Sequence, residues 1–260
     1  MRKVSIWGII LMCVMGAVLA SCGDDKSDDS PTTLSVNPSS VNLYYEGTQQ
    51  LSASGATSWS SENVFVAKVD SKGLVTANHV GSTNILVSNG NAMGKCAVTV
   101  IPKYNCYDTP LLNWGASKSA ISAAETHTAS SSSSSTSLGY GYTNGSVTSV
   151  VLYMFEDNAL KSVGVVASYS DYAQIALHLL ERYQIIGKDD DNNYYFIDSM
   201  DTNTANNVIA LSTTTISNTK MTMVLYIPNS KKASAPQRRA QMQMKDFHIP
   251  ENVLSILLEH

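Results

Sequence analysis

The stretch Gly73-Leu74-Val75-Thr76-Ala77, followed by Gly81-Ser82-Thr83-Asn84-Ile85-Leu86-Val87-Ser88, decides how the first folded part of the chain is built. Apolar and polar residues largely alternate here, and each segment opens with a glycine, which suits a tight turn needing a positive φ or no side chain. Such alternation between turn residues predicts short strands with one buried face. Similar runs recur throughout residues 34–102, so we expect an all-β sandwich there. The expected strands are Leu34–Val36, Val41–Tyr45, Thr48–Ser54, Ala67–Val69, Leu74–Ala77, Gly81–Ser88 and Gly94–Val100.

Several motifs of this segment occur together in the order and spacing of a known family. They are Glu46-Gly47-Thr48-Gln49-Gln50-Leu51, Trp59-Ser60-Ser61-Glu62-Asn63, Val66-Ala67-Lys68-Val69-Asp70, Gly73-Leu74-Val75-Thr76-Ala77 and Gly81-Ser82-Thr83. With these motifs, residues 34–102 resemble the bacterial Ig-like domain, group 2 (Big_2). The resemblance implies an immunoglobulin-like sandwich of surface proteins, often adhesins, that serves as a spacer or a binding module and carries no catalytic site. Trp59 is large enough to fill the space between two sheets.

The N-terminus has the features of an export signal. Arg2 and Lys3 precede an apolar run, Val4–Val18, that is too short for a comfortable membrane span. The run ends in Leu19-Ala20-Ser21-Cys22, which resembles the lipobox of bacterial lipoproteins. This resemblance implies that the signal peptide, residues 1–21, is removed and that Cys22 is acylated with palmitate-type chains, which hold the protein stably at a membrane. An uncleaved N-terminal membrane helix is the alternative.

Residues 22–33 are charged, small and free of apolar anchors. Such a segment buries too little surface to offset its ordering entropy, so we expect a flexible acidic tether. Acidic residues directly after the lipidated cysteine resemble the signal that takes Bacteroidetes-type lipoproteins to the outer leaflet of the outer membrane. We therefore expect a lipid-anchored outer-membrane protein exposed at the cell surface, with a periplasm-facing position as the alternative.

Charge and cysteine content restrict partners and chemistry. The chain carries a net charge of −4, and loss of Arg2 and Lys3 with the signal leaves −6, which argues against nucleic acid. Cys13 lies in the signal and Cys22 in the lipobox, which leaves Cys96 and Cys106. In an oxidising compartment we expect these two to form a disulfide, with two free buried thiols as the alternative. The sequence contains no metal-ligand spacing, and we expect no metal or cofactor.

The sequence of residues 103–228 predicts an α+β domain. A helical stretch, Lys118 to Thr126, and a second, Asp171 to Ile186, are each followed by three strand-like runs. This predicts tandem α-β-β-β repeats, with two helices on one face of a six-stranded antiparallel sheet. The topology and the hairpin at Tyr153–Leu160 are similar to the β-lactamase inhibitory protein and the small lipoproteins of the outer-membrane assembly machine.

The helix-free face of that sheet is the expected partner-binding surface, because the resembled folds bind partners there. The tyrosines on the expected strands are Tyr140, Tyr142, Tyr153, Tyr195 and Tyr226, and tyrosine is common at interfaces. The alternative is that these rings only fit a pleated, half-buried surface. Residues 229–260 form a basic linker and a short amphipathic segment, whose apolar stripe (Val253, Leu254, Leu257, Leu258) we expect to dock on the protein itself.

Sequence signatures of catalysis are missing. Asp189, Asp191 and Asn193 have the spacing of a calcium loop, but Tyr194 stands where glycine is needed and Met200 where glutamate is needed. We therefore predict a monomeric, non-enzymatic cell-envelope lipoprotein that acts as a binding or adhesion module for a protein or glycan ligand. The alternatives are a periplasmic adaptor or inhibitor of another envelope protein, and a hydrolase with an unrecognised site.

Overall fold

The computed structural model describes residues 32–130 and 133–229, and from the C-terminal segment Ala240, Gln241, Gln243, Met244, Phe247, Ile249, Val253 and Leu257. The predicted signal peptide, the lipidation site Cys22 and the tether up to residue 31 lie outside the described residues. So do Leu254 and Leu258 of the predicted apolar stripe. Among the described residues, no helix is long and apolar enough to cross a membrane.

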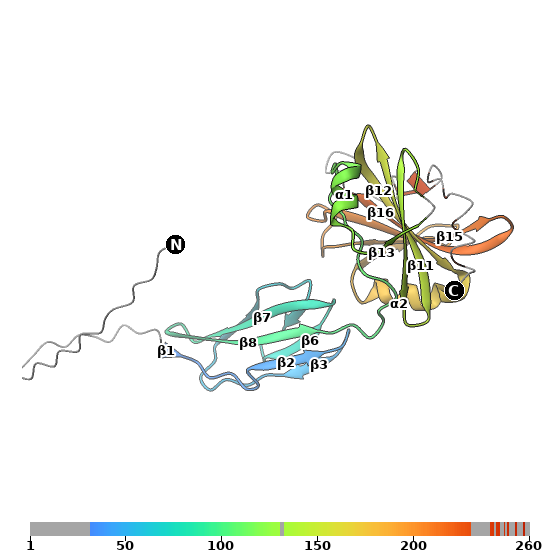
Figure 1. Cartoon of the computed structure of the whole chain (residues 1–260). Helices are drawn as coiled ribbons and strands as arrows, with labels where there is room; N and C mark the ends of the chain where they lie inside the picture. Colours follow the sequence, from blue (N-terminus) through green and yellow to red (C-terminus); the bar gives the residue numbers. More distant parts are fainter. Residues whose placement is uncertain are drawn as a thin grey trace, which may run out of the picture. The chain divides into compact units, whose positions relative to one another are not determined.

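The first part of the described chain is a β-sandwich (Figure 1). One sheet has five strands in the order β1-β8-β7-β4, with β2 also paired to β8, and the other has three strands in the order β3-β6-β5. Side chains from both sheets, among them Val75, Ile85 and Val98, meet in one hydrophobic core. The strands are β1 (Thr32–Thr33), β2 (Ser40–Leu43), β3 (Thr48–Gln50), β4 (Ser58–Ser61), β5 (Ala67–Val69), β6 (Leu74–Ala77), β7 (Gly81–Ser88) and β8 (Ala92–Val100).

The stretch that predicted the sandwich lies at its centre. Strands β6 and β7 follow the expected bounds, and Gly73, with φ of +83°, makes the turn into β6. A Cβ at Gly73 would lie 3.0 Å from Cζ2 of Trp59, so the indole packs directly on this glycine. The all-β sandwich is confirmed. The expected strand at Leu34–Val36 is wrong, because pairing with β8 begins earlier, at Thr32 and Thr33.

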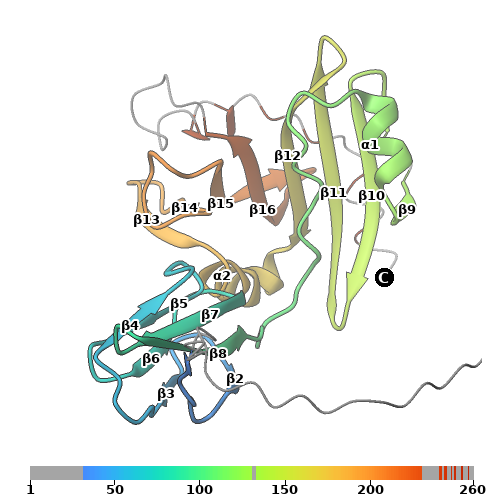
Figure 2. The same cartoon turned by 90° about the vertical axis from the view of Figure 1, so that its left-hand side faces the viewer.

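The second part is one antiparallel sheet of eight strands rather than the expected six (Figure 2). Its order is β13-β14-β15-β16-β12-β11-β10-β9. The two additional strands are the short edge strands β9 and β13, which occupy chain that the helical periodicity assigns to helix ends and connectors. The elements are α1 (Lys118–Ala124), β9 (Thr128–Ala129), β10 (Ser137–Asn144), β11 (Val147–Glu156), β12 (Ala159–Ser168), the 3₁₀ turn η1 (Tyr169–Asp171), α2 (Tyr172–Leu180), β13 (Gln184–Lys188), β14 (Tyr194–Ile197), β15 (Asn207–Ile216) and β16 (Thr219–Pro228).

Both helices pack on one face of this sheet. Ile121 of α1 and Ile175 and Leu179 of α2 are buried in the same core as alternate residues of the central strands, such as Val151 and Val165. Because side chains alternate across a strand, the residues between them point to the opposite face. The helix α2 ends at Leu180, whereas the apolar stripe predicted a helix to Ile186; that last residue of the stripe belongs to β13 instead.

Described residues of the C-terminal segment pack on the opposite face of the sheet. Ala240, Met244 and Phe247 pack against residues of β14, β15 and β16, and Val253 and Leu257 pack against β11, β12 and β16. The expectation of an open, helix-free face is therefore wrong. The sequences of β11 and β16 indicate that this second face is covered, because near-continuous apolar runs are typical of strands buried on both faces. Docking of the apolar stripe on the protein itself is confirmed for Val253 and Leu257.

The expected disulfide between Cys96 and Cys106 is also wrong, because both cysteines are free thiols. Cys96 lies on β8 and points into the core of the sandwich, whereas Cys106 is buried in the core beneath the two helices. Each sulfur is thus enclosed in its own hydrophobic cluster, and the alternative of two free buried thiols holds.

Candidate functional site

The described residues enclose a polar groove beside the β13–β14 hairpin, built from two adjoining cavities. The first has a volume of about 400 Å³ and the second about 370 Å³. We call the pair the hairpin groove. The first cavity is lined by Asp189, Asp191, Asn193, Ser212, Thr213, Thr214, Met223, Gln241 and Met244. The second is lined by Tyr169, Tyr172, Asp191, Asn192, Asn193, Tyr194, Thr213 and Lys220.

Asp189 holds the hairpin in shape. Its Oδ1 accepts the backbone N–H groups of Asp191 at 3.1 Å and Asn193 at 2.9 Å, while its Oδ2 accepts the Tyr195 hydroxyl at 2.6 Å and the Gln241 amide at 2.9 Å. Burial acts to raise the pKa of Asp189, but the hydrogen bonds from Tyr195, Asn193 and Gln241 outweigh it and keep that pKa well below its usual range. Asp189 is therefore an ionised structural group whose oxygens are already engaged.

Three tyrosines provide the aromatic lining of the second cavity. Tyr169 is 45% exposed, and the Lys220 ammonium lies 4.0 Å from its ring centroid, a cation–π contact that holds the ring at the surface. The ring of Tyr172 lies 6.0 Å from that of Tyr169. Tyr172 and Tyr194 also pack against the core beneath the helices, so their positions are fixed by the fold.

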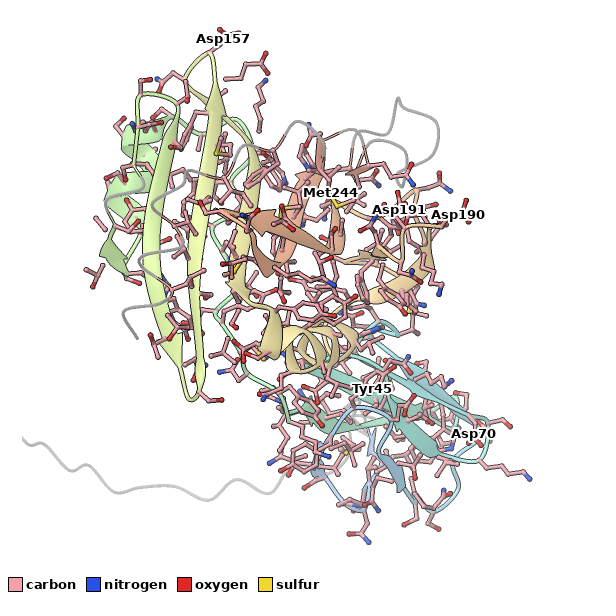
Figure 3. The ribbon with its side chains drawn as sticks, turned by 90° about the vertical axis from the view of Figure 1, so that its right-hand side faces the viewer. Tyr45, Asp70, Asp157, Asp190, Asp191 and Met244 are labelled. Carbon is pink, nitrogen blue, oxygen red and sulfur yellow. The ribbon has the colours of Figure 1, made fainter. Side chains whose placement is uncertain are left out.

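Polar groups with unused hydrogen-bonding capacity lie where the two cavities meet. Asp191 and Thr213 line both cavities. Within the described part of the chain, the Asp191 carboxylate and the Thr213 hydroxyl have no hydrogen-bond or ion-pair partner. Figure 3 shows Asp191 next to Asp190, on the same side of the molecule as Met244. The groove thus offers a free anionic acceptor, a free hydroxyl and, at Lys220, a cation.

A second polar cluster surrounds His127. Its Nδ1 lies 2.6 Å from Oε1 of Glu125, and its Nε2 lies 3.9 Å from Oδ2 of Asp108. The other Glu125 oxygen accepts the Tyr153 hydroxyl, and this hydroxyl in turn accepts the backbone N–H of Leu111 at 3.2 Å. The imidazole therefore lies beside two acids, and the network attaches the connector before α1 to the segment between α1 and β9 and to β11. We interpret this cluster as structural.

The tyrosines expected on an open face are mostly core residues. Tyr140, Tyr153 and Tyr226 are buried in the core on the helix side, and Tyr195 is buried on the opposite face beneath the C-terminal segment. Only Tyr142 of this set is partly exposed, and its ring meets His127 edge-on at 4.6 Å. The partner-binding role expected for the four buried rings is wrong, because no ligand reaches a side chain enclosed by the core.

The hairpin groove was only partly visible in the sequence. The spacing of Asp189, Asp191 and Asn193 drew attention to this loop as an incomplete calcium loop, and the structure makes it the tip of a β-hairpin. No sequence pattern placed Tyr169 and Lys220 at one site, because they reach the groove from η1 and from the start of β16, far apart along the chain. Among the described residues, no group of three His, Cys, Asp or Glu side chains is placed to hold a metal ion.

Comparison with known protein families gives a match for one segment of the chain, within the sandwich. Residues 44–91 match the family model of the intimin immunoglobulin-like domain, so the sandwich contains a bacterial Ig-like domain. No curated protein matches the chain. A solved intimin mutant from EHEC O157:H7 is 21% identical, with 46% of this chain and 78% of that chain covered and a TM-score of 0.22. Domains 5–6 of the S-layer protein SbsC are 14% identical, with 77% and 85% covered and a TM-score of 0.23.

Proposed function

We propose that this protein is a non-enzymatic, surface-exposed lipoprotein of the Bacteroidetes type that binds a ligand outside the cell. The Ig-like domain, of the Big_2 kind, is the spacer, and the C-terminal sheet with its helices is the binding module. The observation that carries this proposal is the hairpin groove, where preformed cavities combine an exposed aromatic ring with free polar groups. Ligand sites are typically concave, largely preformed and equipped with a few placed polar groups.

The position of the protein in the envelope is supported by two independent features. The lipobox at Leu19–Cys22 implies acylation, and the acidic residues after it resemble a surface-export signal. The match of residues 44–91 to an Ig-like domain of intimin supports a module of surface adhesion or surface structure. An anchor, a tether and a spacer together leave the last part of the chain best placed to meet a partner.

We also infer that the C-terminal part is a tandem repeat similar to the resembled inhibitory protein, in which each α-β-β-β unit is extended by one short edge strand, β9 or β13. In support, a helix followed by antiparallel strands occurs twice along the chain, and the last strand of each copy, β12 and β16, pair with one another. The binding face of those relatives has no counterpart here, because the C-terminal segment covers it. The hairpin groove takes its place as the candidate site.

Acylation and surface exposure are tested in cells that make the full chain. A palmitate analogue carrying an alkyne should label the wild type and Cys13→Ser, which leaves the lipobox intact, and should not label Cys22→Ser. Protease added to intact cells should then remove the wild-type protein. If the protease removes the protein only after the cells are permeabilised, the result favours the periplasmic adaptor. A protein that is neither labelled nor membrane-bound would contradict the proposal.

A further inference from the structure

We propose that the hairpin groove binds a carbohydrate chain, and that its two cavities are adjoining subsites for neighbouring sugar units. The inference rests on the proposed function, because it assigns a ligand class to the same site. It is carried by the combination of one exposed and two partly buried aromatic rings, free hydrogen-bonding groups and mixed charge around two adjoining cavities.

The polar lining argues against a lipid or another apolar ligand. Apart from the tyrosine rings, the apolar side chains of the groove are Met223 and Met244, both in the first cavity. A hydrocarbon placed there would take Asp191, Thr213 and Lys220 out of water without offering them a partner. Burying a polar or charged group in that way is unfavourable.

Ligand hydroxyl groups match the hydrogen-bonding groups of the groove that have no partner within the described protein. A carboxylate only accepts hydrogen bonds, an ammonium only donates them, and a hydroxyl does both. The Asp191 carboxylate therefore needs donors, while the Lys220 ammonium needs acceptors. A ligand with many hydroxyls satisfies both with the same chemical group. Because Asp191 and Thr213 line both cavities, each lies within reach of two successive units of one chain.

The tyrosines complete the fit. A sugar ring presents C–H groups on its faces, and these pack against an aromatic ring while the hydroxyls at the ring edge reach polar side chains. Tyr169 is the exposed platform, and Lys220 holds it in place at 4.0 Å. Asp189 fixes the hairpin before any ligand arrives, so little ordering accompanies binding.

The charge of the groove argues against a polyanion as its ligand, and its position argues against a peptide strand. Asp189 and Asp191 would repel the phosphates of a nucleic acid or a phospholipid headgroup. A peptide that extends the sheet would pair with the backbone of the edge strand β13. The groove instead lies across the hairpin tip, η1, the start of α2 and the β15–β16 strands, and none of its described lining residues belongs to β13.

A glycan array tests the ligand class. The full mature chain is applied in a zwitterionic detergent, because sugar-based detergents would compete for the groove. We expect binding to a restricted set of oligosaccharides, followed by calorimetric titration with the best of them. Tyr169→Ala and Asp191→Ala should each weaken the affinity about tenfold or more. The matched controls are Tyr44→Ala, an exposed tyrosine of the sandwich, and Asp190→Ala, the neighbouring exposed aspartate; both should bind like the wild type.

The outcomes separate the two proposals. Glycan binding that is equal in all four variants would overturn the assignment to the groove. An array without signal from a protein that is acylated and protease-accessible on intact cells would overturn the ligand class and leave the surface role standing. Thermal unfolding of each variant shows whether a loss of affinity reflects a loss of folding; a variant that melts like the wild type and still loses binding supports the proposal.

Discussion

The ring of Phe247 lies on the bare backbone of Gly164, so closely that a Cβ at Gly164 would meet the ring, with Cε1 only 2.6 Å away. Gly164 sits in the middle of β12, paired with Leu152 on one side and Leu225 on the other. The missing side chain thus creates the recess in which the C-terminal segment docks. A glycine that weakens a strand by its own flexibility is here compensated by a packed aromatic ring.

Gly164→Ala should therefore destabilise the protein, although alanine is the better strand residue. We expect the new methyl group to displace Phe247 and to lower the free energy of unfolding by about 1–3 kcal/mol. Urea denaturation of both proteins measures the change. In a Phe247→Ala background the recess is empty, so the same substitution should cost little or nothing. Equal losses in the two backgrounds would show that the ring does not occupy this recess.

The contact between Gly73 and Trp59 gives a matched pair of glycine substitutions in the Ig-like domain. Gly73 and Gly90 both have a positive φ, at +83° and +90°. A methyl group at Gly73 would lie 2.9 Å from Leu51 O and 3.0 Å from Trp59 Cζ2, whereas one at Gly90 would have no neighbour within 4 Å.

Alanine at Gly90 should therefore cost about 1 kcal/mol of backbone strain. Alanine at Gly73 should cost at least about 1 kcal/mol more, because the indole of Trp59 must shift. Thermal or chemical unfolding of the two variants compares them directly; equal losses would mean that the indole packing contributes nothing.

The sandwich was predictable because its strands are short, alternate cleanly and are bounded by glycine turns such as Gly73 and Gly81. The larger sheet was harder to predict, since β11 and β16 are apolar on both faces and do not reveal what covers them. Their second cover, residues such as Phe247 and Val253, stands after a basic linker that suggested a separate tail. The contact between Tyr169 and Lys220 in the groove could not be predicted, because these residues come together only once β12 and β16 have paired.

The two buried thiols predict insensitivity to reducing agent. Burial raises the pKa of Cys106 to about 11 and also raises that of Cys96, so neither is a thiolate near neutral pH. In Cys22→Ser protein purified without its signal, we expect no thiol to react with a disulfide reagent in the folded state and two to react after denaturation. The unfolding midpoint should be the same with and without reductant. A mass lower by two hydrogens, or an unfolding midpoint that falls on reduction, would show that Cys96 and Cys106 form a disulfide.

His178 gives the fold a defined dependence on pH. This side chain is fully buried at the end of α2, where its Nδ1 accepts the backbone N–H of Cys106 at 3.2 Å. Burial, assisted by the nearby Arg182 charge, lowers the pKa of His178 to about 3, whereas an unfolded histidine titrates near 6.5.

Between those two values the unfolded chain binds a proton that the folded chain does not. The stability contributed by neutral His178 is therefore present above pH ~6.5 and falls by about 1.4 kcal/mol for each pH unit below it. The free energy of unfolding, measured by urea denaturation from pH 7 to pH 5, should show this slope. His178→Asn retains an acceptor for the Cys106 N–H and removes the titrating group. The variant should be less stable at pH 7. Below pH ~6.5 its free energy of unfolding should fall less steeply than that of the wild type, by about 1.4 kcal/mol for each pH unit. His79, also buried and with a pKa lowered chiefly by burial, leaves a remaining slope in that variant. An unchanged slope in His178→Asn would mean that this imidazole binds a proton as readily in the folded protein as in the unfolded chain.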